Sequence, residues 1–359
     1  MEKPLKIGVI GCGEIAQTMH LPVLSDLPCY EVAAICDISE YVLNHVGDKY
    51  GIKNRYLDYR DLVNQSDLDA VLVTTHEHAA PTLAALSHGK HVLTEKPIAF
   101  NLNQADQMIL AAKETQKTLM VAYNRRFDPG FEWVLSHLET INDPAFVRVH
   151  DFGGSFNPIN EMYQVYKRVD ISREMIQKAK DQSKREAIEA LGPERAHLSD
   201  LYLSLVLLCS HDSNILHEAY GKPVRILHVE AQENWFVFAL LELANGAICS
   251  WETGLLTGLP DWDQHLSVYN DQYRIDLDFN FPYNKNFPTG VRMKQFDQDV
   301  YVEKQIKKSV QSSFKREWQH FYDCVVNQRE PITSGEKARQ DLEFLIGLIQ
   351  SIEEFRPKF

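Results

Sequence analysis

Short apolar segments alternate with amphipathic segments over the first 125 residues of this chain. The apolar segments are rich in Val, Ile and Leu and have the length of buried parallel strands; they are residues 7–10, 32–36, 70–74, 90–93 and 118–122. Between them, residues 80–86 and 102–114 carry apolar side chains at helical spacing. This repeat of strand, helix and strand predicts a doubly wound α/β sheet with right-handed crossovers.

The pattern changes after Tyr123, where longer segments of alternating polar and apolar residues begin. Such alternation is typical of antiparallel strands, and the expected strands are residues 146–152, 224–229, 235–243, 247–253, 266–269 and 272–279. One face of this sheet should be covered by helices, and the other left for solvent, a ligand or a partner subunit. We therefore predict one domain over residues 1–123 and a second α/β domain over residues 124–359.

A charged segment near residues 155–200 interrupts the second domain. Its helical spacing runs from Glu161 to Leu191 and stops at Gly192-Pro193. We interpret it as a solvated helical insertion, with a lid or a dimerisation arm as the alternative. Two more helices are predicted at residues 314–326 and 335–355, the second with a core-facing stripe of Leu342, Leu345, Ile346, Ile349 and Ile352.

Composition and charge exclude several classes of protein. A chain of 359 residues with 44% hydrophobic content buries a large core in two domains. Its net charge of −13 argues against nucleic acid or an anionic membrane as a partner. No segment approaches the roughly 20 apolar residues of a membrane span, and Met1 leads directly into the first strand, so we expect a cytoplasmic protein. The six cysteines show no Cys-x-x-Cys spacing and are expected to be reduced core thiols.

The first strand runs into Gly11-x-Gly13-x-x-Ala16, and Asp37 follows at the end of the second strand. In this dinucleotide-binding fingerprint Gly11 permits a tight turn, Gly13 lets the backbone approach a pyrophosphate, and Ala16 lets the helix pack closely. The phosphates then lie at a helix N-terminus. The carboxylate of Asp37 can accept hydrogen bonds from both ribose hydroxyls but repels a 2′-phosphate, so we expect NAD rather than NADP.

Further motifs accompany the glycine loop: His78, Gly89-Lys90-His91-Val92, Glu95-Lys96-Pro97, Asn124-Arg125-Arg126-Phe127 and Glu330-Pro331-Ile332-Thr333-Ser334-Gly335. With these motifs the chain resembles the Gfo/Idh/MocA family of nicotinamide-dependent sugar and cyclitol oxidoreductases. The resemblance implies an N-terminal Rossmann domain, a C-terminal α/β domain with a large, mostly antiparallel open sheet, and a homo-oligomer, either a dimer or a tetramer. It also implies cofactor contacts from Glu14, Ile15, Thr74, Thr75, His78, Glu95 and Lys96.

Lys96 is the first candidate catalytic residue. An ammonium group at the C-terminal edge of a parallel sheet points into the ligand crevice and can stabilise the alkoxide that forms as hydride leaves the adjacent carbon. The resemblance implies that Lys96 lies beside the nicotinamide and the substrate hydroxyl. Burial beside a positively charged nicotinamide would lower its pKa toward the working pH. The alternative is a surface lysine paired with Glu95.

His211 is the second candidate, because it matches the catalytic histidine of the family. Imidazole titrates near neutrality and can exchange a hydroxyl proton with the substrate. The family pattern is altered here, since Leu207 and Asn214 replace the two acids that usually flank the histidine. A satisfied core histidine is the alternative interpretation of His211.

Asn124 and Arg125 follow a strand on the crevice side and are candidate substrate ligands for hydroxyl, carboxylate or phosphate groups. An interdomain ion pair is the alternative for this motif. Asn214 and His217 are further substrate-binding candidates. The sequence His76-Glu77-His78 offers no predictable third ligand, so no metal is expected.

These observations predict an NAD-dependent oxidoreductase that transfers hydride between nicotinamide and a secondary alcohol or ketone carbon of a sugar, cyclitol or related polyol. Two alternatives remain open: a reductase of an imine or unsaturated substrate, and a non-catalytic NAD-binding sensor. The missing acids favour the first alternative, whereas retention of Lys96 and His211 argues against the second.

Overall fold

The computed structural model describes residues 3–138, 144–155, 162–232, 236–256, 258–353 and 355–356. The chain forms two compact units. The first comprises Met1–Tyr123, Met162–Ala190 and Glu317–Leu342, and the second comprises Asn124–Glu161, Leu191–Arg316 and Glu343–Phe359. Glu161 and Trp235, which begin two of the predicted segments, lie outside the described residues.

The first unit contains a six-stranded parallel sheet with the order β3-β2-β1-β4-β5-β6, as the sequence predicts for a doubly wound fold. Its strands are β1 (Leu5–Ile10), β2 (Tyr30–Cys36), β3 (Asn54–Tyr56), β4 (Ala70–Val73), β5 (His91–Glu95) and β6 (Leu119–Ala122). Every residue of β4 and β6 is buried, which explains why these segments are continuously apolar. The polar edge strand β3 has no such signal and was not predicted.

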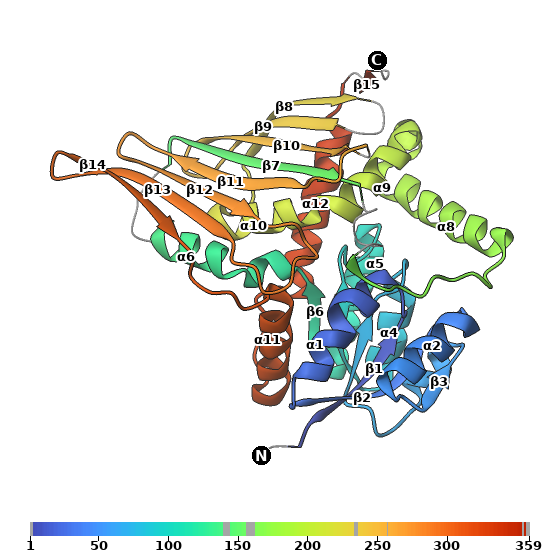
Figure 1. Cartoon of the computed structure of the whole chain (residues 1–359). Helices are drawn as coiled ribbons and strands as arrows, with labels where there is room; N and C mark the ends of the chain where they lie inside the picture. Colours follow the sequence, from blue (N-terminus) through green and yellow to red (C-terminus); the bar gives the residue numbers. More distant parts are fainter. Residues whose placement is uncertain are drawn as a thin grey trace. The chain divides into compact units, whose positions relative to one another are not determined.

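Helices surround this sheet (Figure 1), and their bounds are α1 (Leu21–Asp26), α2 (Glu40–Tyr50), α3 (Tyr59–Val63), α4 (Ala79–Ser87) and α5 (Leu102–Thr115). Two of them, α4 and α5, are the helices predicted at residues 80–86 and 102–114. A π-helical turn, η1 (Ala16–His20), precedes α1. Such turns occur frequently at functional sites.

The second unit contains a nine-stranded sheet with the order β14-β13-β12-β11-β7-β10-β9-β8-β15. Its strands are β7 (Phe146–Gly154), β8 (Arg225–Gln232), β9 (Phe236–Glu242), β10 (Ile248–Leu256), β11 (Asp263–Tyr269), β12 (Tyr273–Phe279), β13 (Gly290–Asp297), β14 (Val300–Ile306) and β15 (Phe355–Arg356). The β7–β10 and β8–β15 pairs are parallel and the other pairs are antiparallel. The mostly antiparallel sheet is therefore confirmed, while β13, β14 and β15 were missed.

The two faces of this sheet differ in polarity. Val147, Val149 and Trp251 are buried on one face, which packs against α6 (Pro129–Leu138) and α10 (Ser210–Tyr220). Arg148 and Glu252 alternate with them and point to the other face. One face is thus covered by helices, as the alternating pattern predicts.

The charged segment contains α8 (Arg173–Leu191), which begins at Arg173 rather than at the predicted residue 161. Ser172 caps this helix, because its Oγ accepts a hydrogen bond from the Met175 amide at 3.2 Å. The helix stops before Gly192, whose φ of +87° only glycine adopts readily. Residues 172–182 are exposed, whereas Ala187 is buried, so the helix is solvated mainly along its first half.

The remaining helices are η2 (Asn124–Phe127), η3 (Pro193–Leu198), α9 (Ser199–Leu208), α11 (Ser313–Asn327) and α12 (Gly335–Gln350). α12 ends before the predicted residue 355, and every member of its predicted apolar stripe is buried. All six cysteines are free thiols, and five of them are buried. Within the described ranges, none of the helices has the length and apolar character needed to span a bilayer.

Candidate functional site in the nucleotide-binding unit

Gly11 forms the turn after β1 with a φ of +94°. A Cβ atom at this position would lie 2.8 Å from the Thr74 carbonyl carbon, so only glycine fits. The Gly11 amide donates to the Cys36 carbonyl at 2.8 Å, and Thr74 Oγ1 donates to the Gly11 carbonyl at 2.5 Å. These contacts hold the predicted glycine loop at the C-terminal ends of β1, β2 and β4.

The predicted cofactor residues Gly13, Glu14 and Ile15 lie where the loop enters its helix, which begins at Glu14 and continues into η1. Amides in the first turn of a helix lack intrahelical partners and favour anions. The group nearest to a Cβ at Gly13 would be the Arg168 guanidinium, 3.3 Å away at Nη2. Glycine backbone, a helix N-terminus and a nearby cation fit the pyrophosphate of a dinucleotide.

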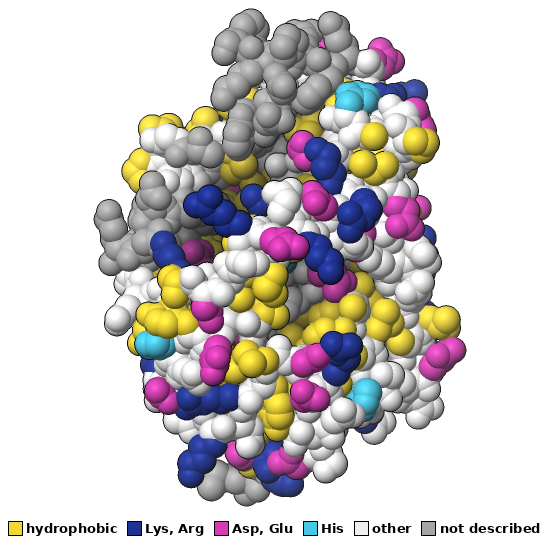
Figure 2. Space-filling view, turned by 90° about the vertical axis from the view of Figure 1, so that its right-hand side faces the viewer, with side chains coloured by type: hydrophobic (Ala, Val, Ile, Leu, Met, Phe, Trp, Pro, Cys, Tyr) yellow, Lys and Arg dark blue, Asp and Glu magenta, His cyan; other side chains and the backbone are white. Residues whose placement is uncertain are grey.

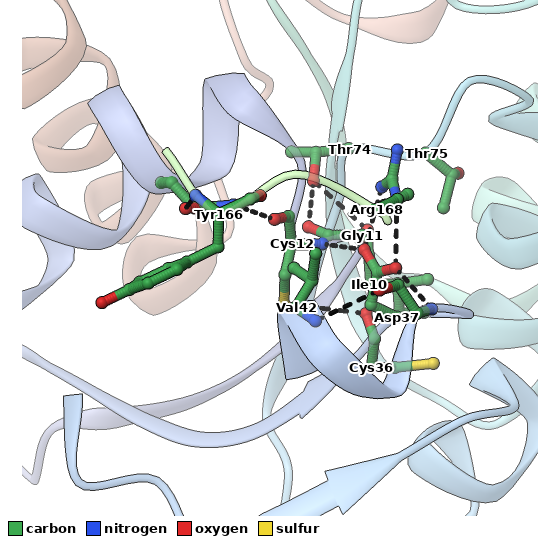
Figure 3. A network of polar contacts seen from close by, with 12 residues as sticks. Ile10, Gly11, Cys12, Cys36, Asp37, Val42, Thr74, Thr75, Tyr166 and Arg168 are labelled. Atoms are coloured by element: carbon green, nitrogen blue, oxygen red, sulfur yellow. Dashed lines mark hydrogen bonds and ion pairs between the residues drawn. The ribbon is translucent and has the colours of Figure 1, made fainter. Parts of the chain in front are cut away.

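Asp37 is 3% exposed and accepts hydrogen bonds at both carboxylate oxygens (Figure 3). Oδ1 accepts from the Ser39 amide at 2.9 Å and from Arg168 Nε at 3.1 Å. Oδ2 accepts from the Cys12 amide at 2.8 Å and from Arg168 Nη2 at 2.9 Å. A carboxylate has roughly four lone-pair positions, and these four contacts use them. The bare carboxylate on which the expected NAD preference rested is therefore neutralised by an arginine.

Arg168 was not anticipated from the sequence, because no local motif marks it. It lies on residues 162–172, which precede α8 and pack against the glycine loop (Figure 3). Gln17 anchors this segment: its Oε1 accepts from the Tyr166 amide at 2.8 Å, and its Nε2 donates to the Tyr166 carbonyl at 2.9 Å. Asp170 adds a hydrogen bond from the Tyr41 amide at 3.0 Å.

A cavity of about 620 Å³ opens beside Asp37 and Arg168. Figure 2 shows a hollow with hydrophobic side chains on a face where acidic and basic groups are interspersed. The apolar part of the cavity lining includes Ile38, Leu57, Ile171, Met175 and Ile176, and the charged part is Asp37, Asp58, Arg60, Arg168 and Lys180. Gly11 and Thr75, both predicted cofactor contacts, also line it. Its volume and apolar walls suit a nucleoside.

Lys96 follows the last residue of β5 and is half-buried. Its backbone amide donates to Glu95 Oε2 at 3.1 Å, and the Lys96-Pro97 peptide is cis. On the other side, His78 Nδ1 donates to the Pro97 carbonyl at 2.6 Å. The backbone around Lys96 is thus held at the edge of the parallel sheet by two buried residues that the sequence also singles out.

Two buried carboxyl groups, Glu95 and Glu317, have opposite pKa shifts. Burial acts to raise the pKa of Glu95, but the hydrogen bond from His20 and the nearby charge of Lys96 outweigh it, so the pKa is lowered. Burial, followed by the charge of Glu95, raises the pKa of Glu317 well above its usual value. Glu95 is therefore ionised near neutral pH, whereas its surroundings favour the protonated form of Glu317.

Candidate substrate residues in the second unit

His211, Asn214 and His217 lie three residues apart along α10. Asn214 is buried, and the two histidines are half-buried. Arg125 is buried in η2, where its Nη2 donates to the Asn280 carbonyl at 2.9 Å. Asn124, the other predicted substrate residue, is also buried in η2.

Arg126 forms an ion pair with Glu218 at 2.7 Å, and both residues belong to the second unit. An interdomain ion pair was the alternative interpretation of this motif. Arg126 does form an ion pair, but with a residue of its own unit. The pKa of Arg125 is lowered by burial despite the nearby charges of Asp128, Asp151 and Asp212.

Asp151 and Asp212 form an acidic pair that was not predicted from the sequence. Gln264 Nε2 donates to Asp212 Oδ1 at 2.8 Å, and Trp262 Nε1 donates to Asp151 Oδ1 at 2.9 Å. Burial and then the charge of Asp151 raise the pKa of Asp212 well above its usual value. The available signal was that Asp212 directly follows His211, so a carboxyl group is retained here although position 207 is leucine.

The histidines that the sequence raised as metal ligands have other partners. His76 Nε2 lies 2.8 Å from Ser183 Oγ, and His78 binds the Pro97 carbonyl. In the described part of the chain, a different group, His150, Asp263 and His265, brings its ligand atoms within 4.8 Å of one another. Hydrogen-bonding distances of 3.3 Å join Asp263 to each histidine.

Relationship to known proteins

The parallel sheet, glycine loop and Asp37 define a Rossmann-type dinucleotide-binding domain. Residues 5–123 match the Gfo/Idh/MocA model, an oxidoreductase family with an NAD-binding Rossmann fold.

Curated relatives match over less than half of the chain. Myo-inositol 2-dehydrogenase of Thermotoga maritima is 35% identical over 149 residues, which are 40% of this chain and 44% of that protein. The uncharacterized oxidoreductase YrbE of Bacillus subtilis is 32% identical over 153 residues, which are 42% and 45% of the two chains. The matches thus span less than half the length of these relatives.

Solved structures match over nearly the whole chain. The 3-ketoreductase KijD10 of Actinomadura kijaniata, in complex with NADP, has a TM-score of 0.75 at 18% identity and covers 99% of both chains. A putative NADPH-dependent oxidoreductase of Desulfitobacterium hafniense has a TM-score of 0.79 at 16% identity and covers 99% of this chain and 97% of that chain. At such identities these likenesses show the two-domain fold.

Proposed function

We propose that this protein transfers hydride between a nicotinamide cofactor and a secondary alcohol or ketone carbon of a sugar, cyclitol or related polyol. The observation that carries the proposal is the position of Lys96, half-buried directly after β5 in the unit whose glycine loop fits the pyrophosphate. Ligands of doubly wound sheets bind at this C-terminal edge of the strands. The family match and the inositol dehydrogenase relative support this class of chemistry.

The cofactor, when bound, supplies hydride transfer at C4 of the nicotinamide. Lys96 then donates a hydrogen bond to the substrate oxygen and stabilises the negative charge that develops there. His211 is proposed to accept the hydroxyl proton during oxidation and to return it during reduction. For the cofactor we propose NAD(H), with Asp37 accepting hydrogen bonds from the ribose hydroxyls after Arg168 has moved.

The second unit offers groups that suit a polyol. Asp151, Asp212 and Gln264 combine hydroxyl acceptors with an amide donor, and Arg125 supplies a buried cation nearby. We propose that this group, together with Asn124, Asn214 and His217, binds the substrate hydroxyls. Asp212 would then supply the carboxylate that the family pattern has at the position of Leu207.

The test is oxidation of a library of sugars, inositols and glycosides with NAD or NADP, followed by the absorbance of the reduced nicotinamide. Lys96→Met is expected to lower kcat at least about 100-fold with little change in cofactor affinity. Lys113→Met is the matched control, because that lysine is 64% exposed and pairs with Glu336. Tight cofactor binding without turnover of any polyol would overturn the proposal in favour of a sensor or a reductase of another substrate.

A further inference from the structure

Arg168 occupies the region between the glycine loop and Asp37, although it lies 131 residues from Asp37 in the sequence. Its guanidinium bonds both carboxylate oxygens and bounds the open side of Gly13. The Gln17–Tyr166 hydrogen bonds hold its segment against the same loop. A cation is therefore built into the place where the adenosine ribose and the pyrophosphate are expected.

The carboxylate of Asp37 already accepts four hydrogen bonds. It therefore affects the binding of a ribose with a free 2′-hydroxyl and of a ribose with a 2′-phosphate differently. The hydroxyls of NAD(H) can reach Asp37 only if they displace Arg168, because the contacts of Asp37 use its lone pairs. A 2′-phosphate does not need to displace Arg168 from Asp37. Arg168 carries five N–H donors, of which Asp37 receives two, and its side chain is 39% exposed and lines the cavity.

The charges around the cavity also complement an anion. The lining contains two carboxylates, Asp37 and Asp58, and three cations, Arg60, Arg168 and Lys180. The excess of one positive charge opposes the repulsion that a lone Asp37 would exert on a phosphate. Guanidinium groups bind phosphate bidentately, which adds geometric selectivity to the electrostatic attraction.

We propose that Arg168 recognises the 2′ position of the adenosine ribose, so that the protein binds NADP(H) through this residue in addition to NAD(H). The proposal rests on the nicotinamide-dependent function proposed above. It assigns residues 162–180 to the nucleotide site itself, as the segment that supplies Arg168, Lys180 and the apolar wall around Met175. The predicted solvated insertion would then determine cofactor choice.

The experiment measures binding of NADPH and NADH by fluorescence titration, and of 2′,5′-ADP and 5′-AMP by calorimetry, to the full chain. We expect Arg168→Gln to weaken the binding of NADPH and of 2′,5′-ADP at least about tenfold. NADH should bind equally well or more tightly, because Asp37 is released from its ion pair. Arg168→Lys should retain part of the phosphate affinity, since it keeps the charge without the fork. Arg173 is exposed at the start of α8, so Arg173→Gln should change the affinity for neither cofactor.

Arg168→Gln could lose affinity for NADPH and NADH equally while its melting temperature stays unchanged. This result would show that Arg168 only holds the segment in place, and it would overturn the proposal. Unchanged NADPH affinity, or a wild-type protein that binds NADH but not 2′,5′-ADP, would also overturn it. Binding of both cofactors without polyol turnover would instead refute the proposed reaction and leave the role of Arg168 supported.

Discussion

His20 donates a hydrogen bond to Glu95, the residue immediately before Lys96, with 2.9 Å between Nε2 and Oε1. Trp318 Nε1 donates to His20 Nδ1 at 3.1 Å. An indole N–H only donates, so Nδ1 must accept and the proton that reaches Glu95 is the one on Nε2. A chain of buried groups thus orients the carboxylate that binds the Lys96 amide.

Replacement of this histidine, His20→Phe, should lower the free energy of unfolding by about 3 kcal/mol near neutral pH. His20 helps to hold the pKa of Glu95 below its usual 4.5. A lowered carboxyl pKa stabilises the fold above the unfolded pKa, and this stabilisation is lost as the pH falls through the folded pKa. The deficit, measured by urea unfolding, should therefore shrink below pH 4.5. His88→Phe at an exposed position is the control, and a deficit independent of pH would contradict the assignment.

Glu317→Gln should change the pH dependence of stability in the opposite sense. Glu317 is fully buried, and its oxygens have no hydrogen-bond partner within the described ranges. A raised carboxyl pKa means that folding takes up a proton, so the wild type loses about 1.4 kcal/mol per pH unit above the unfolded pKa. The variant lacks this loss. Its stability relative to wild type should rise as the pH increases from the unfolded toward the folded pKa of Glu317, whereas exposed Glu114→Gln should show no such trend.

Gly11→Ala should cost at least about 2 kcal/mol of stability and most of the cofactor affinity. The substitution places a Cβ against the Thr74 backbone at a φ of +94°, so the loop must move. Gly290→Ala is the matched control, because a Cβ there meets nothing within 4 Å. Urea unfolding and NADH titration measure the two effects. Wild-type affinity in Gly11→Ala would show that the loop does not bind the dinucleotide.

Most of the first sheet could be predicted because its strands are buried on both faces and are therefore continuously apolar, as β4 and β6 illustrate. Two of the strands that were missed, β3 and β14, have little burial to impose a pattern. β14 is exposed along most of its length at the edge of the second sheet, and β3 is a short polar edge strand. Edge strands are defined by their hydrogen-bonded neighbour rather than by their own hydrophobicity.

The residues of the candidate site also divide into those that the sequence predicts and those that it does not. Gly11, Asp37 and Lys96 could be assigned from local motifs, because a turn, a strand end and their spacing lie within short stretches of sequence. Arg168 and Trp318 carry no motif, and their partners Asp37 and His20 lie 131 and 298 residues away. Asp151 and Asp212 become neighbours only because β7 and α10 pack together.

The sequence by itself determined the doubly wound domain, the glycine loop and the acid that follows β2, because each depends on the conformation and burial of neighbouring residues. The tertiary structure decided what surrounds that acid. It placed Arg168 against both oxygens of Asp37 and so changed a bare carboxylate into a neutral pair. The energy of a charge depends on the groups within a few ångströms of it, and distant segments supply those groups only when the chain folds.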